Sequence, residues 1–275
     1  MSARDVPADL ARETEEFRER GFVVVRGVFR VEEMDVLRQA IENHAAMRAH
    51  AARAADLSRG ATRPSFDSIF VWNDTSGFDL FAKATRSARI IDRLEAYFGD
   101  EVYVYHNKIA LKYPGVVGFS FHQDYAYWYD MGCLFPDMAT VQVAVDPSTL
   151  ENGCLRFIAG SHKLGRINHV FKDGVSDSMV DPERLEQARK IMPEVPVELE
   201  RGDIAIFHAN ILHGSDDNHS DQSRIALLGC YNTRHNNPYK TVYGHPRYHH
   251  QEKVREAITM ADIGNLPDFD YQWKE

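Results

Sequence analysis

From residue 102 to residue 231 the chain consists mainly of short apolar runs, each bounded by turn-forming residues such as Gly, Pro, Asn, Asp and Ser. Short runs rich in Val, Ile, Phe and Tyr are typical of β-strands rather than of helices. We predict strands at residues 102–113, 117–124, 139–146, 154–158, 197–200, 203–208, 211–215 and 224–231. Many short strands with turns between them favour a mainly β fold, either a sandwich or a jelly roll.

Helices are expected around this β region. Apolar side chains at helical spacing predict helices at residues 7–20, 31–50, 87–98 and 181–191. The candidate inward side chains of the first two are Leu10, Phe17, Met34, Leu37 and Ile41. Between these helices, residues 22–28 form an apolar run that predicts a further strand. Residues 51–70 are rich in Ala, Arg and Ser, which indicates a mobile connection.

The length of the chain is compatible with one domain, because 275 residues can bury a single sizeable core. We expect a single domain over residues 1–275. It would have a helical N-terminal support at about 7–98, a β core at about 102–231 and a polar, His-rich C-terminal extension at 232–275.

Composition excludes some classes of function. The formal net charge is -9, and the chain has no basic stripe of the kind that nucleic-acid binding requires. No apolar run has the length of a signal peptide or of a membrane span, so we expect no membrane partner. The three cysteines, Cys133, Cys154 and Cys230, are odd in number and lack metal-ligand spacing. They are expected to be buried thiols in a reducing cytoplasm.

Three residues offer a candidate metal site: His122, Asp124 and His213. In an extended strand, alternate side chains share a face, so His122 and Asp124 can bind one ion while Gln123 points away. His213 would come from a distant strand. Two imidazoles and one carboxylate, with positions left open, are the ligand set of non-haem Fe(II) oxygenases.

The chain contains a second His-x-Asp pair, His219 and Asp221, so the pair alone is not specific. It lies in the polar run 216–222, which is typical of a solvated turn. The apolar runs on either side of this turn predict an antiparallel hairpin. Symmetric pairing about the turn places Arg224 opposite His213. An Arg there could be a rim charge, but beside a metal it is suited to a two-pronged contact with a carboxylate.

These motifs resemble the phytanoyl-CoA dioxygenase family of 2-oxoglutarate-dependent oxygenases, from residue 19 to about residue 231. Residues 150–162 (LENGCLRFIAGSH) look like the family's ENG-L-IPGSH stretch, with Ala159 where Pro is usual. Gly202-Asp203 leads into His213-Gly214-Ser215, and Arg224 follows His213 by eleven residues. The resemblance implies a double-stranded β-helix of the cupin type. It also implies Fe(II) held by His122, Asp124 and His213, with 2-oxoglutarate and O2 as cosubstrates and Arg224 and Ser215 on the far carboxylate.

Other polar and aromatic residues are candidates for the same pocket. Thr140 and Gln142 alternate with Val141 and Val143, which predicts a polar face looking into the barrel. The family often places a cosubstrate-binding polar residue on the strand before the metal pair, which here carries Asn107 and Lys108.

The substrate side is expected from aromatic residues that follow Asp124, namely Tyr125, Tyr127 and Trp128. They could equally be core aromatics, although Trp128 resembles the ectoine hydroxylase branch of the family. We expect His162 to be structural. The histidines of the C-terminal extension, His235, His245, His249 and His250, are expected to be solvated rather than to form a second metal site.

The resemblance implies an enzyme that hydroxylates a small polar metabolite or natural-product intermediate and releases succinate and CO2. An acidic chain with an aromatic site entrance favours a compact or cationic ligand over a coenzyme A thioester. Two alternatives remain at this point. One is a metal cupin that needs no keto acid, acting as an isomerase or another dioxygenase, and the other is a non-catalytic metal-binding or small-molecule-binding module. The oligomeric state is not predicted.

Overall fold

The computed structural model describes residues 8–47, 69–171 and 178–266. Its helices are α1 (Ala8–Arg20), α2 (Val31–Asn43), α4 (Leu80–Thr85), α5 (Ala88–Phe98), α6 (Asp124–Asp130) and α7 (Pro182–Ile191), with 3-10 turns η2 (Ser161–Leu164), η3 (Arg234–Asn236) and η4 (Met260–Gly264). The strands are β1 (Phe22–Val25), β2 (Ile69–Trp72), β3 (Val102–Lys112), β4 (Met138–Ala144), β5 (Leu155–Ile158), β6 (His169–Phe171), β7 (Ser178–Val180), β8 (Glu194–Val197), β9 (Ile204–His208), β10 (His213–Ser215) and β11 (Arg224–Thr233).

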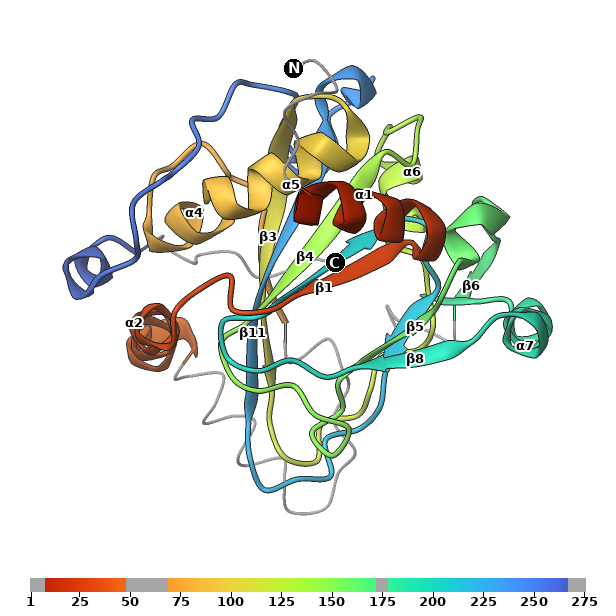
Figure 1. Cartoon of the computed structure of the whole chain (residues 1–275), viewed down its shortest axis with the longest axis horizontal. Helices are drawn as coiled ribbons and strands as arrows, with labels where there is room; N and C mark the ends of the chain where they lie inside the picture. The colour runs from red at the N-terminus through yellow and green to blue at the C-terminus, as the bar shows by residue number, and fades with distance from the viewer. Residues whose placement is uncertain (1–7, 48–68, 172–177, 267–275) are drawn as a thin grey trace.

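Two antiparallel sheets form most of the β region, and β6 and β7 form a separate two-stranded antiparallel sheet. The larger sheet has six strands in the order β1-β9-β4-β11-β3-β2, and the smaller has three in the order β10-β5-β8. In Figure 1 strands β5 and β8 lie apart from β3, β4 and β11, with α7 outside them. This mainly β arrangement of two sheets confirms the predicted jelly-roll fold of the cupin type.

The large sheet has one apolar face and one mixed face, because successive side chains of a strand point to opposite sides. On β4, Val141 and Val143 belong to the main hydrophobic core, whereas Thr140 and Gln142 line a cavity. On β3 and β11, core residues likewise alternate with residues that line the cavity. The sheet therefore keeps its packing and its polar groups on opposite faces.

The N-terminal helices cover the apolar face of this sheet. The predicted inward residues Phe17, Met34, Leu37 and Ile41 all belong to the core, and Leu10 packs against its edge. Helix α5 buries Ile90, Ile91 and Leu94, begins with a Ser87 side chain that accepts from the Arg89 N–H, and ends at Gly99 in the left-handed region. The helical support was thus predictable from apolar spacing.

Several predicted strands differ from the structure. Residues 117–124 form no strand; His122 makes an isolated antiparallel bridge with His213, and Asp124 begins α6. The predicted hairpin is also wrong, because His213 on β10 pairs with Phe157 on β5, whereas Arg224 on β11 pairs with Lys112 on β3. The polar turn therefore crosses from one sheet to the other. Of the predicted mobile connection at 51–70, all but Ile69 and Phe70 lies outside the described residues.

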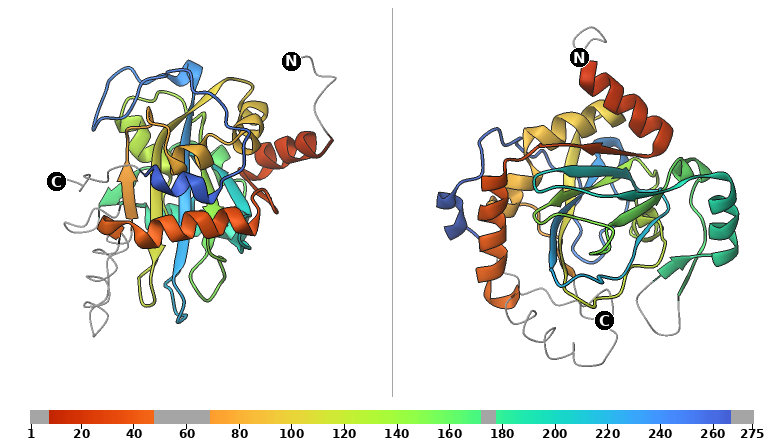
Figure 2. Two further views of the ribbon diagram at one scale, coloured as in Figure 1. Left: turned by 90° about the vertical axis from the view of Figure 1, so that its left-hand side faces the viewer. Right: turned by 60° about the horizontal axis from the view of Figure 1, so that its bottom comes forward.

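The segment after β11 packs against the protein instead of extending from it. Val254 and Ile258 are buried, and the Ile258 N–H donates to the Glu33 carboxylate at 3.0 Å. Figure 2 shows η4 lying along α2. Of the four histidines expected to be solvated, His235 and His250 are exposed and His249 is partly exposed, whereas His245 is buried. No described helix is long and apolar enough to cross a bilayer.

Gly118 controls the approach of the loop before α6 to β10. A Cβ at this position would lie 1.8 Å from the Ser215 carbonyl oxygen, which is backbone and cannot move aside cheaply. We expect Gly118→Ala to lower the unfolding free energy by about 1–3 kcal/mol, as overpacking does. A urea titration measures the change. Gly264→Ala is the control, since a Cβ there meets nothing within 4 Å; equal midpoints for the two variants would contradict this account.

Candidate metal centre and its cavity

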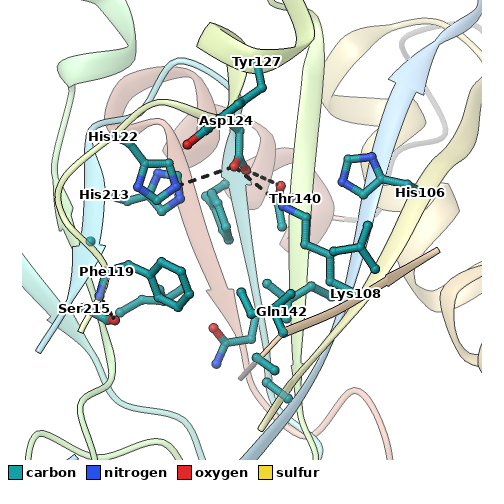
Figure 3. Close-up of a pocket in the computed structure, with 18 of the residues that line it drawn as sticks. His106, Lys108, Phe119, His122, Asp124, Tyr127, Thr140, Gln142, His213 and Ser215 are labelled. Atoms are coloured by element: carbon teal, nitrogen blue, oxygen red, sulfur yellow. Dashed lines mark hydrogen bonds and ion pairs between the residues drawn. The ribbon is translucent and has the colours of Figure 1, made fainter. Parts of the chain in front are cut away.

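A cavity of about 150 Å³ lies where the mixed face of the large sheet meets β10, β5 and the loop before α6. Its walls include Lys108 from β3, Gln142 from β4, Arg224 from β11 and Ser215 from β10. Figure 3 shows Lys108, Gln142 and Ser215 in the same pocket as His122, Asp124 and His213. Elements far apart in the sequence thus line one cavity that is partly open to solvent.

The three predicted metal ligands are brought together at one side of this cavity. One ligand atom from each of His122, Asp124 and His213 can be chosen so that all lie within 4.8 Å of one another. The His122 N–H donates to the His213 carbonyl at 2.8 Å, and the His213 N–H donates back at 3.0 Å. Among the described residues, these three form the only group of His, Cys, Asp and Glu side chains that could hold a metal ion. The second His-x-Asp pair, His219 and Asp221, is not part of such a group.

Gln123, between the two proximal ligands, points away as predicted and anchors the loop. Its amide donates to the carbonyls of Gly165 at 2.8 Å and Asn210 at 2.7 Å, and its oxygen accepts from the Ile167 N–H at 2.7 Å. All these bonds are to backbone, so the fully buried side chain acts as a brace. The loop that carries His122 and Asp124 is therefore held from behind.

Both histidines present the same ring nitrogen to the site. Nδ1 of His122 lies 2.8 Å from the Ser120 carbonyl, and Nδ1 of His213 lies 3.1 Å from the Ile211 carbonyl. Because a carbonyl only accepts, Nδ1 carries the proton in each ring and Nε2 keeps its lone pair. Burial, with a smaller contribution from His122, lowers the pKa of His213 to about 3. The His213 ring is therefore neutral, as a metal ligand must be.

Asp124 is held in its ionised form. Burial by itself would raise its pKa, but the Lys108 charge, electrostatic interactions with the rings of His213 and His122 and a hydrogen bond from Thr140 lower the pKa to about 2. Thr140 donates to Oδ2 at 2.6 Å, which leaves Oδ1 facing His122 Nε2 at 3.8 Å. Two imidazole nitrogens and one carboxylate oxygen on one side of an open cavity fit Fe(II).

A cationic end of the cavity is built from Arg224, Lys112 and Ser215. Arg224 is 4% exposed, donates to the Gly153 carbonyl, and its buried Nε has no partner among the described residues. Burial lowers the pKa of Arg224 to about 10, so it stays charged at neutral pH. Lys112 Nζ donates to Ser215 Oγ at 3.0 Å and to the Gly153 carbonyl at 3.3 Å. An unpaired guanidinium N–H beside a hydroxyl fits a carboxylate.

The other predicted residues divide between the cavity and the packing around it. Gln142, Lys108, Tyr127 and Trp128 line the cavity, and Thr140 does so while bonding Asp124.

Asn107 and Tyr125 are not among the lining residues. Asn107 lies on the opposite face of β3 from Lys108, and the Tyr125 hydroxyl donates to the Leu134 carbonyl at 2.6 Å. His162 packs over Gly21, as expected for a structural residue. The three cysteines are buried and free, as predicted.

Sequence reasoning missed four residues of this region: His106, Lys112, Phe119 and His245. His106 and Lys112 share a face of β3 with Lys108, so the period of two along this strand would have identified them. His245 was expected to be solvated, but it is 4% exposed and lines the cavity. No local pattern could place it there, because residues 234–250 reach the site only by packing back over β3.

Proteins of similar sequence support the family resemblance. The family model described as "Phytanoyl-CoA dioxygenase (PhyH)" matches residues 17–226. Dioxygenase lolE1 from Epichloe uncinata is 31% identical over 53% of this chain and 52% of its own length. L-proline trans-4-hydroxylase from Streptomyces griseoviridis is 29% identical over 60% of this chain and 67% of its own length. The chain thus spans about half to two thirds of these relatives.

A solved structure shares the fold. The crystal structure of EctD from S. alaskensis with 2-oxoglutarate and 5-hydroxyectoine superimposes with a TM-score of 0.70 at 20% sequence identity. The match covers 93% of this chain and 89% of that one.

Removing a metal ligand should weaken Fe(II) binding more than any other change. We expect His122→Ala, Asp124→Ala and His213→Ala each to raise the Fe(II) dissociation constant by more than about 100-fold, since even outer partners of a ligand are worth about 10- to 100-fold. Anaerobic titration with a competing chelator measures this. His219→Ala is the control and should bind as the unaltered protein does; undiminished affinity in any triad variant would remove that residue from the site.

Thr140 should act through Asp124. Thr140→Val keeps the shape of the side chain but removes the hydroxyl donor, so we expect Fe(II) affinity to fall by about 10- to 100-fold. Thr85→Val is matched, because the Thr85 hydroxyl is also buried but bonds the Phe81 carbonyl in α4. The same chelator titration compares them; identical affinities would mean that the Thr140 bond does not orient the carboxylate.

Proposed function

The chain belongs to the phytanoyl-CoA dioxygenase family, and we propose that it is an Fe(II)- and 2-oxoglutarate-dependent dioxygenase that hydroxylates a small polar metabolite. The observation that carries this proposal is the pairing of two features in one cavity. The His122, Asp124 and His213 triad lies on one side, and the buried, partly unpaired Arg224 lies at the cationic end.

Each end of 2-oxoglutarate has a complementary group in this cavity. Its keto acid would bind the metal at the positions that the triad leaves open. Its far carboxylate would accept hydrogen bonds from the Arg224 guanidinium and the Ser215 hydroxyl. Lys112 supports this end, because its Nζ donates to Ser215 Oγ and shares the Gly153 carbonyl with Arg224. When bound, Fe(II) and 2-oxoglutarate supply an oxidant from O2, with loss of CO2 and release of succinate.

The chain itself contributes orientation and exclusion of water. Ile69, Val71 and Leu228 line the cavity together with Tyr127 and Trp128, so a small molecule would lie against apolar and aromatic walls beside the metal. A C–H bond held there would lie near the metal and be partly shielded from solvent. Among the residues predicted to bind cosubstrate, Gln142 lines the same cavity and remains a candidate for that role.

A cupin that needs no keto acid is the main alternative. It would have no use for a buried guanidinium with an unpaired Nε at the far end of the cavity. A non-catalytic binding module is disfavoured by an intact triad that shares one cavity with a buried guanidinium. We also propose a reducing, cytoplasmic location, because Cys133, Cys154 and Cys230 are free.

The cosubstrate assignment is tested by anaerobic titration of the Fe(II) protein with 2-oxoglutarate, followed by its visible charge-transfer band. In Arg224→Met the loss of a charge-assisted contact of roughly 1.5–3 kcal/mol should raise the dissociation constant by about 10- to 100-fold. Arg255→Met is the control, since that side chain is 72% exposed. The proposal fails if no band forms in the unaltered protein, and Arg224 is only structural if its variant binds normally.

The substrate is identified by a screen for compounds that stimulate succinate release. Small amino acids, amines and natural-product intermediates are expected to stimulate it, and an acyl-CoA is not. Mass spectrometry of the product should show the gain of one oxygen atom. Efficient turnover of acyl-CoA with no response to small polar compounds would overturn the substrate class.

A further inference from the structure

A buried lysine lies directly behind the cationic end of the cavity. Lys112 is the last residue of β3, pairs with Arg224 on β11 and is 2% exposed. Ser215 and Arg224 line the cavity, but Lys112 is not among the lining residues. Contact with a ligand in the cavity is therefore made by Ser215 and Arg224, and Lys112 lies one layer further back.

The hydrogen bonds of Lys112 use all the donors of its charged form. Nζ donates to Ser215 Oγ at 3.0 Å, to the Gly153 carbonyl at 3.3 Å and to the Asp216 carbonyl. An ammonium has three N–H donors and no lone pair, so none is left for a ligand. Nζ can lie here because Gly153 has no side chain; a Cβ at that position would be 2.8 Å from Nζ.

The hydroxyl of Ser215 receives two hydrogen bonds. Besides the bond from Lys112, the Phe119 N–H donates to Oγ at 3.1 Å. An ammonium and a backbone N–H can only donate, so both lone pairs of the hydroxyl are occupied and its hydrogen is left to donate. None of the described residues accepts this hydrogen. Because Ser215 lines the cavity, next to Phe119 in Figure 3, the hydrogen is available to a group bound there.

We propose that Lys112 is a positioning residue for the cosubstrate: by donating to Oγ, it directs the hydroxyl hydrogen of Ser215 to the far carboxylate of 2-oxoglutarate. This inference rests on the proposed function, in which Arg224 and Ser215 contact that carboxylate. Without the bond from Lys112, the hydroxyl could donate elsewhere and present a lone pair to the carboxylate. Two acceptors facing each other form no hydrogen bond, so the contact would be lost.

The charged groups around Lys112 come from three parts of the chain. Burial is the largest influence on its pKa, and it acts with the charge of Arg224 on β11 to lower that pKa. Asp217 and Asp216, in the turn after β10, and Cys154, just before β5, act in the opposite direction. The resulting pKa of Lys112 is about 7, so both protonation states are populated near neutral pH.

Loss of the proton reverses the bond between Lys112 and Ser215. A neutral amine has two hydrogens and one lone pair. The carbonyls of Gly153 and Asp216 can only accept, so they take the two hydrogens, and the Ser215 hydroxyl must then donate to Nζ. The hydroxyl hydrogen is thereby withdrawn from the cavity. Affinity for 2-oxoglutarate should therefore be greatest below the pKa of Lys112 and fall as the pH rises through it.

A double-mutant cycle tests whether Lys112 acts through Ser215. Anaerobic titration of the Fe(II) protein with 2-oxoglutarate is carried out at a pH of about 6, where Lys112 is charged. Lys112→Met removes the donors and should raise the dissociation constant about tenfold. In the Ser215→Ala background the same substitution should change it by less than about twofold, because the hydroxyl that Lys112 orients is gone.

The control for the cycle is Lys83→Met, which also removes a lysine but one that pairs with Asp262 and does not line the cavity. It should bind 2-oxoglutarate as the unaltered protein does. Equal effects of Lys112→Met with and without the Ser215 hydroxyl would mean that Lys112 acts by its charge alone. That result would overturn the inference.

A pH series tests the same point without a substitution at Lys112, in case Lys112→Met does not fold. Between a pH of about 6 and about 9, the dissociation constant of the unaltered protein should first stay level and then rise about tenfold. Ser215→Ala should show a change of less than about twofold over the same range, and effects of pH on the metal are common to both proteins. A level profile in the unaltered protein, or an equal rise in Ser215→Ala, would overturn the inference.

The proposed function and this inference fail in different ways. If the unaltered protein binds no 2-oxoglutarate, the proposed function is wrong and the inference falls with it. If the unaltered protein binds 2-oxoglutarate but the effects of Lys112→Met and Ser215→Ala simply add, only the inference is wrong.

Discussion

The antiparallel bridge between His122 and His213 is the interaction on which the site depends. Two backbone hydrogen bonds, of 2.8 and 3.0 Å, join the loop before α6 to β10 and so place two ligands side by side. The bridge forms because neighbouring positions carry no Cβ: a side-chain carbon at Gly118 would collide with the Ser215 carbonyl, and one at Gly214 would press on the Phe119 carbonyl at 2.8 Å. Gln123 then holds the loop from the other side. The candidate metal ligands are thus positioned by backbone contacts.

The large sheet carries its core residues on one face and its polar, cavity-lining residues on the other. Its strands place Val141, Val143 and their neighbours in a continuous core under the N-terminal helices, while Thr140 and Gln142 face the cavity. Because successive side chains alternate, polar groups can be added to one face without opening the other. The two faces differ in charge as well. Lys108, Lys112 and Arg224 gather around the cavity in a chain whose formal net charge is -9, so composition gave no indication of the charge inside.

The sequence predicted the positions of the main strands and the types of the candidate ligands, but it did not predict which strands pair. The apolar runs that became β3, β4, β9 and β11 were located within one or two residues. The hairpin inferred around the turn after Ser215 was wrong, because β10 completes the small sheet and β11 the large one. Arg224 nevertheless reaches the same cavity as His213, since the two sheets face each other. A local rule thus led to two residues that line one cavity, although the strand pairing from which it was inferred is wrong.

By itself the sequence determined most of the core strands, the fold class and the candidate metal ligands, because these follow from local spacing and from the chemistry of His, Asp and Arg. Tertiary structure alone decided the bridge that joins His122 to His213, the exclusion of Asn107 and Tyr125 from the cavity, and the arrival of His245 at its wall. These depend on which strands pair and how the last segment packs over β3. Such choices are made by contacts between distant residues, and no local pattern encodes them.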